Sequence, residues 1–155
     1  PELTARENIF LGQETTRFGF TDPREESKEA RKLFERIGVD IDPEERCVNL
    51  TIAQQQAVEI VKALRIEARI IVMDEPSATL TDRETRRLFE IIRELKAHGL
   101  GIIYISHRME EIFEIAERVT VLRDGAHVAT EETSKIEQGK LIELMVGALT
   151  LVRVI

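Results

Sequence analysis

The stretch Arg69-Ile70-Ile71-Val72-Met73-Asp74-Glu75-Pro76 constrains the fold more than any other part of this sequence. Four apolar residues are followed at once by two carboxylates and a proline. A short apolar run rich in β-branched residues is typical of a buried strand, which we expect to be parallel to its neighbours and covered on both faces. Acids at the carboxyl end of such a strand lie where open α/β sheets bind their ligands. An ordinary strand that meets solvent in a charged turn gives the same pattern. The segments on either side are therefore needed to distinguish a ligand site from such a turn.

Strand and helix patterns alternate after this run. A capped helix is expected between Thr81 and Gly99, followed by a second apolar strand over residues 102–105. The remaining expected elements are a helix around 109–116, a strand over 118–122, a turn at Asp124-Gly125, a return strand over 126–130 and a last helix over 138–146. This order predicts an α/β fold with a parallel sheet and right-handed crossovers.

The first 66 residues show helical patterns only. Capping signals at Thr4, Asp22 and Thr51 precede three helices with apolar faces, and the stretch from Gly12 to Phe20 is turn-like. We therefore expect a helical unit over residues 1–66 and an α/β unit over residues 67–147. The tail, residues 148–155, is apolar without clear periodicity, which fits either an added strand or a poorly ordered end.

The charge balance restricts the partners of the chain. With 29 acidic and 22 basic residues, the net charge of −7 argues against general binding of nucleic acid. The single cysteine, Cys47, excludes an internal disulfide and favours a reducing, cytoplasmic setting. No apolar run approaches the ~20 residues of a membrane span, no signal peptide is present, and the start at Pro1 without a methionine indicates a mature or truncated chain.

Polar residues at the two strand ends suit nucleotide chemistry. Asp74 is placed to hold Mg²⁺ through a water beside phosphates, and Glu75 to deprotonate an attacking water. His107 follows the next strand, where an imidazole can donate to a γ-phosphate, although a lone histidine more often caps a helix or faces solvent. The amino end of the helix at Thr51 suits an anion, although capped helices of this kind are common.

Three segments, in their order and spacing, resemble the nucleotide-binding domain of ABC transporters. They are Leu50-Thr51-Ile52-Ala53-Gln54, the run that ends in Asp74-Glu75, and Ile105-Ser106-His107. The sequence is most similar to the amino-terminal ATPase domain of the sugar-import (ribose/galactose) type, from Pro1 to about Gly147. The resemblance implies a partial P-loop NTPase (RecA-like) parallel sheet with an α-helical subdomain, the latter within residues 1–66.

The resemblance assigns the signature motif and the D-loop to two segments. The signature motif, usually LSGGQ, acts in trans on ATP held by a partner domain. Its residues here are Thr51, Ile52, Ala53 and Gln54. Isoleucine and alanine replace its two glycines, as is common in the sugar-import type, and the threonine keeps the hydroxyl. The D-loop residues are Ala78, Thr79, Leu80 and Thr81, with alanine and threonine where serine and alanine are usual.

By the same resemblance, Asp74 is the Walker B aspartate, Glu75 the catalytic glutamate and His107 the switch histidine. No G-x-x-x-x-G-K-[ST] sequence is present, and the family's Q-loop glutamine and adenine-stacking aromatic are also missing. In the family, the P-loop strand lies between the strands equivalent to 102–105 and 118–122. We therefore expect either marginal stability or a pairing of residues 118–130 that differs from the family.

These correspondences imply part of an ATPase subunit of an ABC importer, which uses ATP and Mg²⁺ to drive uptake of a sugar or related solute. Such a subunit docks on a transmembrane permease at the cytoplasmic face of the membrane and dimerises head to tail with a second ATPase domain. The chain alone is expected to be inactive for lack of the P-loop. A non-catalytic or degenerate module that only supplies a signature motif fits the same residues. A DNA-repair ATPase of similar motif order is disfavoured by the acidic charge and by Gln54-Gln55-Gln56.

Overall fold

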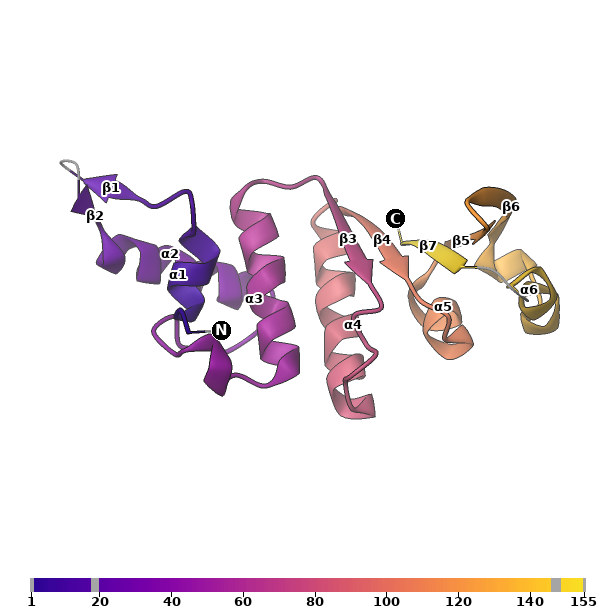
Figure 1. The fold of residues 1–155 in the computed structure, drawn as a ribbon, viewed down its shortest axis with the longest axis horizontal. Coiled ribbons are helices and arrows are strands. Elements are labelled where there is room, and N and C mark those ends of the chain that lie inside the picture. Colours follow the sequence, from indigo (N-terminus) through magenta and orange to yellow (C-terminus); the bar gives the residue numbers. More distant parts are fainter. Residues whose placement is uncertain (1, 18–19, 146–148, 155) are drawn as a thin grey trace. The chain divides into compact units, whose positions relative to one another are not determined.

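Figure 1 shows the chain in a computed structural model that describes residues 2–17, 20–145 and 149–154. The chain forms two compact units. Unit 1 comprises Pro1–Ala68 and Leu80–Ile91, and unit 2 comprises Arg69–Thr79 and Ile92–Ile155. The boundary between Ile91 and Ile92 falls inside helix α4 (Asp82–Ala97), which therefore contributes residues to both units.

Unit 1 is built on helices that begin where the sequence indicates. They are α1 (Ala5–Phe10), α2 (Pro23–Arg36) and α3 (Ile52–Arg65). Thr4 and Thr51 each form a complete capping box, and the Asp22 side chain accepts from the N–H of Glu25. A side-chain acceptor here satisfies an N–H that has no partner within the helix, which explains why the helices start at these residues. The predicted helix starts are confirmed.

The helices of unit 1 pack around an apolar core. Phe10 of α1, Phe34 of α2 and Val61 of α3 are all at most 1% exposed. An ion pair of 3.0 Å between Arg6 of α1 and the buried Glu26 of α2 joins two of the helices at the edge of this core. Burial of the apolar faces is the main source of stability for short helices such as these.

The segment from Gly12 to Phe20 is more regular than the turn-like stretch expected from its sequence. It contains β1 (Thr16–Arg17), which pairs antiparallel with β2 (Phe20–Thr21). A short 3₁₀ turn, Cys47–Asn49, precedes α3. Strands of two residues are too short to show an alternating hydrophobic pattern, so the sequence contained no signal for them.

Unit 2 contains a mixed sheet of five strands. In chain order they are β3 (Ile70–Asp74), β4 (Gly101–Ile105), β5 (Arg118–Arg123), β6 (Ala126–Glu132) and β7 (Leu149–Val154). They lie in the order β3-β4-β7-β5-β6. β3 and β4 are parallel, and β5 and β6 form the predicted hairpin, whose turn residues Asp124 and Gly125 have positive φ angles of 51° and 76°. The predicted α/β class, the parallel pair and the hairpin are confirmed.

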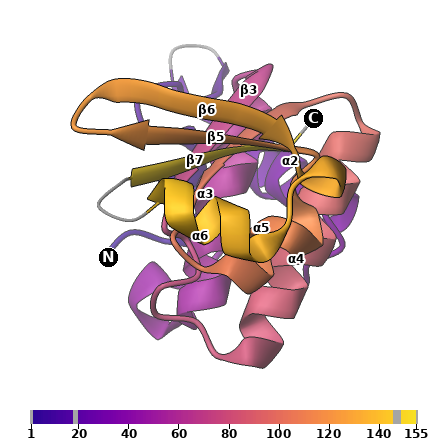
Figure 2. The same cartoon turned by 90° about the vertical axis from the view of Figure 1, so that its right-hand side faces the viewer.

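The two helices that lie wholly within unit 2 are on one side of strands β5, β6 and β7 in Figure 2. They are α5 (Met109–Ile115) and α6 (Gln138–Met145), with a 3₁₀ turn at Thr133–Lys135. Ile112 of α5 and Leu141 of α6 are fully buried. Val146, the last residue of the expected helix, lies outside the described residues. One face of the sheet is therefore covered by helices from the same unit.

The tail of the chain lies between β4 and β5. β7 is antiparallel to both neighbours and places Val152 opposite Tyr104 of β4 and Val119 of β5. Residues 118–122 therefore pair with the tail and not with residues 102–105. Of the two expectations for the tail, the added strand is confirmed. Its backbone provides hydrogen-bonding partners for strand edges that would otherwise lack them.

The first strand of the sheet is covered on one face only, so the expectation of a strand buried on both faces is wrong. Ile71 and Met73 are each 7% exposed, whereas Ile70 and Val72 are 62% and 60% exposed. β3 also forms an edge of the sheet. An apolar β-branched sequence indicates a strand, but whether a second layer covers it depends on the tertiary structure.

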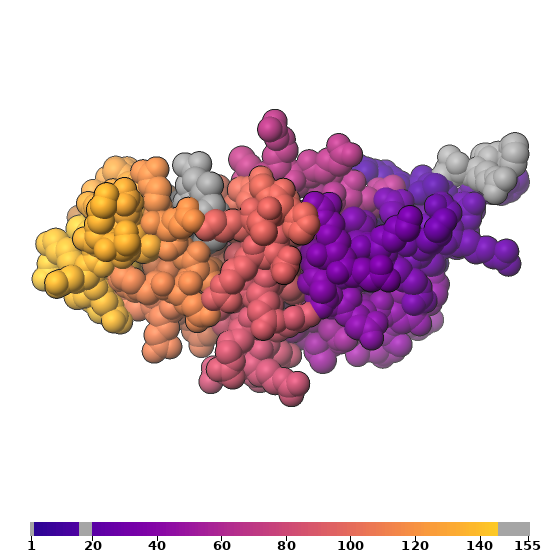
Figure 3. Space-filling view, turned by 180° about the vertical axis from the view of Figure 1, so that it is seen from behind, coloured from indigo at the N-terminus to yellow at the C-terminus, as the bar shows by residue number. Residues whose placement is uncertain are grey.

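Helix α4 forms the pink to salmon surface in Figure 3. Asp82, Arg86 and Glu90 are among its exposed charged residues, while Leu88, Ile92 and Leu95 are buried as their helical spacing predicts. In the described ranges, every helix is too short or too polar to pass through a membrane.

Candidate functional site

The carboxyl ends of β3 and β4 bring two predicted site residues together. The parallel register pairs Asp74, the last residue of β3, with Ile105, the last residue of β4. The N–H of Glu75 then donates to the carbonyl of Ile105 at 2.9 Å, which extends the pairing beyond the strands. Glu75 is therefore one residue, and His107 two residues, beyond the ends of neighbouring strands.

Glu75 and His107 are in direct contact in unit 2. Oε1 of Glu75 lies 2.8 Å from Nδ1 of His107, and the side chains are 44% and 71% exposed. Because an ionised carboxylate only accepts, Nδ1 holds the proton in this contact. Nε2 is then an acceptor in the neutral ring and becomes a donor when the ring is protonated. The pair thus combines a carboxylate base with an imidazole that solvent and ligands can reach.

The backbone of Glu75 is in the left-handed region, with a φ of 44°. A residue with a side chain adopts this conformation at a cost of about 1–2 kcal/mol, and such residues cluster at functional sites. The strained turn is held on both sides, because the N–H bond to Ile105 is followed by a bond from the N–H of Ala78 to the carbonyl of Glu75 at 3.1 Å. These backbone bonds maintain the conformation in which the carboxylate contacts His107.

Asp74 is an exposed carboxylate at the end of β3. In the part of the chain that the structure describes, no three His, Cys, Asp or Glu side chains gather in a way that could hold a metal ion. Beside a nucleotide, Mg²⁺ usually keeps several waters and takes one or two carboxylates together with substrate phosphates, and the exposed carboxylate of Asp74 fits that mode of binding. Asp74 is therefore suited to hold the ion through a water and unsuited to hold it alone.

The predicted signature residues form the first turn of α3 in unit 1. Thr51 Oγ1 accepts from the N–H of Gln54 at 3.3 Å, and Gln54 Oε1 accepts from the N–H of Thr51 at 3.0 Å. The N–H groups of Ile52 and Ala53, the first residues of the helix, have no acceptor within it. This exposed turn can therefore present backbone donors and the Thr51 hydroxyl to an anion.

The predicted D-loop residues have different surroundings from one another. Ala78 and Thr79 are exposed in unit 2, whereas Leu80 is buried in unit 1. Thr81 caps α4, because its hydroxyl oxygen accepts from the N–H of Glu84 at 3.3 Å, and the N–H of Thr81 donates in return to the Glu84 carboxylate at 2.9 Å. Leu80 and Thr81 therefore stabilise the start of α4, and Ala78 and Thr79 are the accessible residues of this segment.

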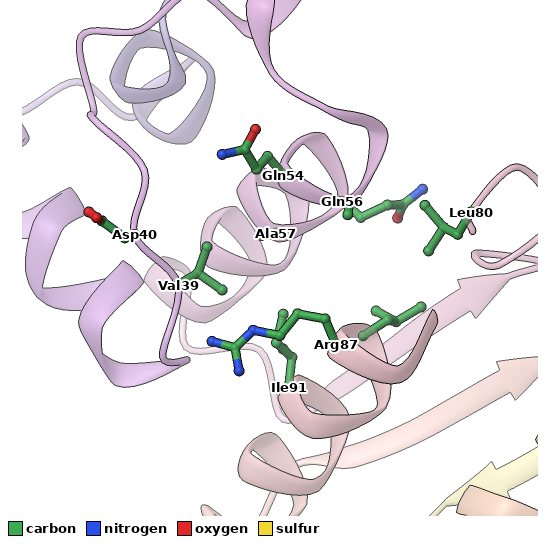
Figure 4. Close-up of a pocket in the computed structure, with 10 residues that line it drawn as sticks. Val39, Asp40, Gln54, Gln56, Ala57, Leu80, Arg87 and Ile91 are labelled. Carbon is green, nitrogen blue, oxygen red and sulfur yellow. The ribbon is translucent and has the colours of Figure 1, made fainter. Parts of the chain in front are cut away.

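A pocket of about 210 Å³ in unit 1 joins signature and D-loop residues (Figure 4). Gln54 of α3 and Leu80 both line it. Arg87 of α4 extends toward the loop at Val39, and its guanidinium donates to the carbonyl of Gly38. The structure thus brings the first turn of α3 close to the residue that precedes the α4 cap.

Sequence reasoning missed a buried carboxylate near the two strand ends. Glu111 of α5 is 5% exposed, and its Oε2 accepts from the hydroxyls of Tyr104 and Ser106, each at 2.9 Å. Nη1 of Arg108 donates to Oε1, also at 2.9 Å. The signal in the sequence is that Glu111 lies four residues before the buried Ile115, and therefore on the apolar face of α5.

The carboxyl group of Glu111 is ionised in this environment. Burial by itself would raise its pKa, but hydrogen bonds from Ser77, Arg108, Tyr104 and Ser106 outweigh burial and lower the pKa below its usual value. Burial is also the main reason why the pKa of the Tyr104 phenol is raised far above its usual range. The phenol therefore remains a donor, and Glu111 remains an acceptor, over the whole neutral pH range.

The chain is similar to ribose import ATP-binding proteins over most of its length. It is 52% identical over 147 residues to ribose import ATP-binding protein RbsA 3 of Rubrobacter xylanophilus. It is 50% identical over 148 residues to ribose import ATP-binding protein RbsA of Lactococcus lactis subsp. cremoris. Each alignment includes 95% of this chain and 30% of the relative, so the chain spans less than a third of the curated relatives it matches. No protein-family model matches the chain.

A solved ATP-binding cassette of an ABC transporter, MJ1267 in its ADP conformation, has a similar fold. The TM-score is 0.76 and the sequences are 25% identical. The superposition covers 94% of this chain and 63% of that chain.

Proposed function

Since the chain is a homologue of the ATP-binding proteins of ribose importers and has the P-loop NTPase fold of an ABC ATPase cassette, we propose that it is part of an ABC-type ATPase. In the complete protein, ATP hydrolysis drives the import of a sugar or related solute. Ribose is the first candidate, because the relatives named above are ribose import proteins.

The contact between Glu75 and His107 supports this proposal most directly. In the proposed reaction, a water molecule attacks the γ-phosphate of ATP, and Glu75 orients this water and accepts its proton. Nδ1 of His107 bonds to Oε1 of Glu75 at 2.8 Å, so Nε2 is the nitrogen that remains for the γ-phosphate. Donation from Nε2 requires the protonated ring, because Nδ1 already holds a proton in this contact.

Asp74 and the first turn of α3 have the other proposed roles. Asp74 holds Mg²⁺ through a water, and the ion neutralises charge on the phosphates when it is bound. Thr51, with the N–H groups of Ile52 and Ala53, contacts the γ-phosphate of ATP held by a second ATPase domain. Gln54 contributes the cap that orients this turn.

We further propose that residues 1–66 are part of a helical subdomain and residues 67–147 part of the RecA-like core, with residues 148–155 as a tail. Ala78 and Thr79 of the D-loop are the accessible contacts to the second ATPase domain, and Leu80 and Thr81 orient the segment. The complete subunit works with a transmembrane permease at the cytoplasmic face of the membrane.

The assignment of Glu75 is tested in the complete protein by Glu75→Gln, which removes the base but keeps the shape of the side chain. We expect ATP turnover to fall by roughly 10²–10⁴-fold, the usual contribution of a general base. The exposed Glu110→Gln is the matched control and should leave turnover unchanged. Turnover close to that of the wild type in Glu75→Gln would show that the base is a different residue.

A calorimetric titration of the 155-residue chain with Mg-ATP tests whether it holds nucleotide by itself. These residues include no G-x-x-x-x-G-K-[ST] sequence, so we expect no measurable binding. One-to-one binding would contradict this expectation and also the alternative of a module that only supplies a signature motif.

A further inference from the structure

Glu111 holds residues from both segments that form the Glu75–His107 contact. Ser77 follows Glu75 by two residues and donates a hydrogen bond to Glu111. Ser106 immediately precedes His107 and donates to the same carboxylate at 2.9 Å. The two serines are 1% and 3% exposed, so water does not compete for these hydrogen bonds.

The orientation of this carboxylate is determined by its other partners. Tyr104, within β4, donates to Oε2 at 2.9 Å, and the guanidinium of Arg108 donates to Oε1 at 2.9 Å. The Ser106 hydroxyl also accepts from the N–H of Arg108 at 3.0 Å, so its own proton is directed at Glu111. Hydrogen bonds to an ionised group are about twice as strong as neutral ones, so this cluster constrains the side chains that it joins.

The two side chains of the candidate site have little packing of their own. Glu75 and His107 are 44% and 71% exposed, so a large part of each side chain is in contact with solvent. Their relative position therefore depends on the backbone segments from which they extend. Glu111 joins these segments through Ser77 on one side and Ser106 on the other.

We propose that Glu111 is a positioning residue, which keeps the base Glu75 and the imidazole of His107 in register by binding the chain segments on both sides. The inference rests on the proposed function of Glu75 and His107 and goes beyond it. Glu111 does not touch the reacting groups. It acts through Ser77 and Ser106, and a misplacement of the base by about 1 Å is enough to reduce turnover about 10²-fold.

The test compares Glu111→Gln with Glu110→Gln in the complete protein. Both variants lose one charge in the first turn of α5, but Glu110 is exposed and Glu111 is buried. We expect Glu111→Gln to lower kcat by about ten- to a hundredfold with less than a twofold change in KM for ATP. Glu110→Gln should change neither constant. Equal kcat values in the two variants would overturn the proposal.

A measurement that does not need activity separates this inference from the proposed function. In protein labelled with ¹⁵N-histidine, the ring nitrogen shifts of His107, assigned by comparison with His107→Gln, report which nitrogen holds the proton. We expect the wild type to show protonated Nδ1, and Glu111→Gln to show a mixture of both tautomers. If the wild type and Glu111→Gln show these two different spectra but the wild type has no ATP turnover, the proposed function fails and the role of Glu111 in orienting His107 stands. An unchanged His107 spectrum in Glu111→Gln refutes the positioning role.

Ser77→Ala keeps the test decisive if Glu111→Gln does not fold. The change removes one hydroxyl and leaves the carboxylate with its other donors. We expect a folded protein with kcat lowered about three- to tenfold and with the His107 tautomers shifted in the same direction. Wild-type kcat together with a wild-type His107 spectrum in this variant would also overturn the proposal.

Discussion

Glu75 and His107 are 32 residues apart in the sequence, yet Oε1 of Glu75 lies 2.8 Å from Nδ1 of His107. The contact follows from the parallel pairing of β3 with β4, which aligns Asp74 with Ile105 and brings the two chain segments out at the same edge of the sheet. The hydrogen bond from the N–H of Glu75 to the carbonyl of Ile105 then sets the height of Glu75 above that edge. A base and an imidazole therefore meet because of the register of the sheet.

The left-handed backbone of Glu75 should cost stability. Asparagine visits this region far more readily than glutamine. We expect Glu75→Asn to be more stable than Glu75→Gln by about 1 kcal/mol in urea unfolding, although both variants lack the carboxylate. The contact with His107 joins two exposed side chains and contributes little to stability, so equal stabilities would mean that the positive φ of 44° stores no strain.

The contribution of Glu111 to stability should depend on pH. Its pKa is lowered in the folded chain, so the folded state binds its proton less tightly than the unfolded state. The contribution is therefore complete above the unfolded pKa and is lost as the pH falls through the lowered folded pKa. At neutral pH, we expect Glu111→Gln to be less stable than the wild type by about 2 kcal/mol.

Urea unfolding of the wild type and Glu111→Gln between about pH 3 and 7 measures this effect. The difference between them should narrow steadily on acidification below about pH 5. The Glu110→Gln variant controls for the loss of one acidic residue from α5. A difference that stays constant over the whole range would contradict an ionised Glu111 in the folded state.

The tail strand should be essential to the sheet. Proline at Val152 removes a backbone N–H in the middle of β7, a strand with neighbours on both sides. We expect Val152→Pro to lose about 3 kcal/mol or more and to expose amides of β4 and β5 to hydrogen exchange. Val152→Thr, which keeps the N–H and the β-branched shape, is the control. Similar exchange in both variants would indicate that β7 does not contribute to the sheet in solution.

The exposed face of β3 should make the 155-residue chain prone to self-association. Ile70 and Val72 are 62% and 60% exposed on an edge strand. We expect the double change Ile70→Thr and Val72→Thr to reduce self-association and the binding of a dye that is specific for exposed apolar surface. The free energy of unfolding should change by less than about 0.5 kcal/mol. Ile71→Thr, at a buried position between them, should instead cost about 2 kcal/mol. If the double variant lost as much stability as Ile71→Thr, the face of β3 that contains Ile70 and Val72 would have to be covered in solution.

The sequence predicted the elements whose determinants are local. The caps at Thr4, Asp22 and Thr51 are satisfied within a few residues of each helix start, so their patterns were sufficient. The hairpin at Asp124-Gly125 is determined in the same way by two residues that tolerate positive φ. The alternation of strands and helices predicted that the carboxyl ends of the strands lie at the same edge of the sheet. Glu75 and His107 could therefore be proposed as parts of one site.

The parts that could not be predicted depend on residues far apart in the chain. The apolar tail had no periodic pattern, and only the tertiary structure placed it as β7 between β4 and β5, because the free strand edges there require hydrogen-bonding partners. The apolar pattern predicted that Ile70 and Val72 are buried. They are exposed, because burial of this face requires a second layer that covers it. The sequence by itself therefore determined the helix starts, strands β3 to β6, and the carboxylates of Asp74 and Glu75 at the carboxyl end of β3. The tertiary structure alone decided which strands are neighbours and that Glu111 binds both segments of the site, because these depend on hydrogen bonds formed only when the sheet is assembled.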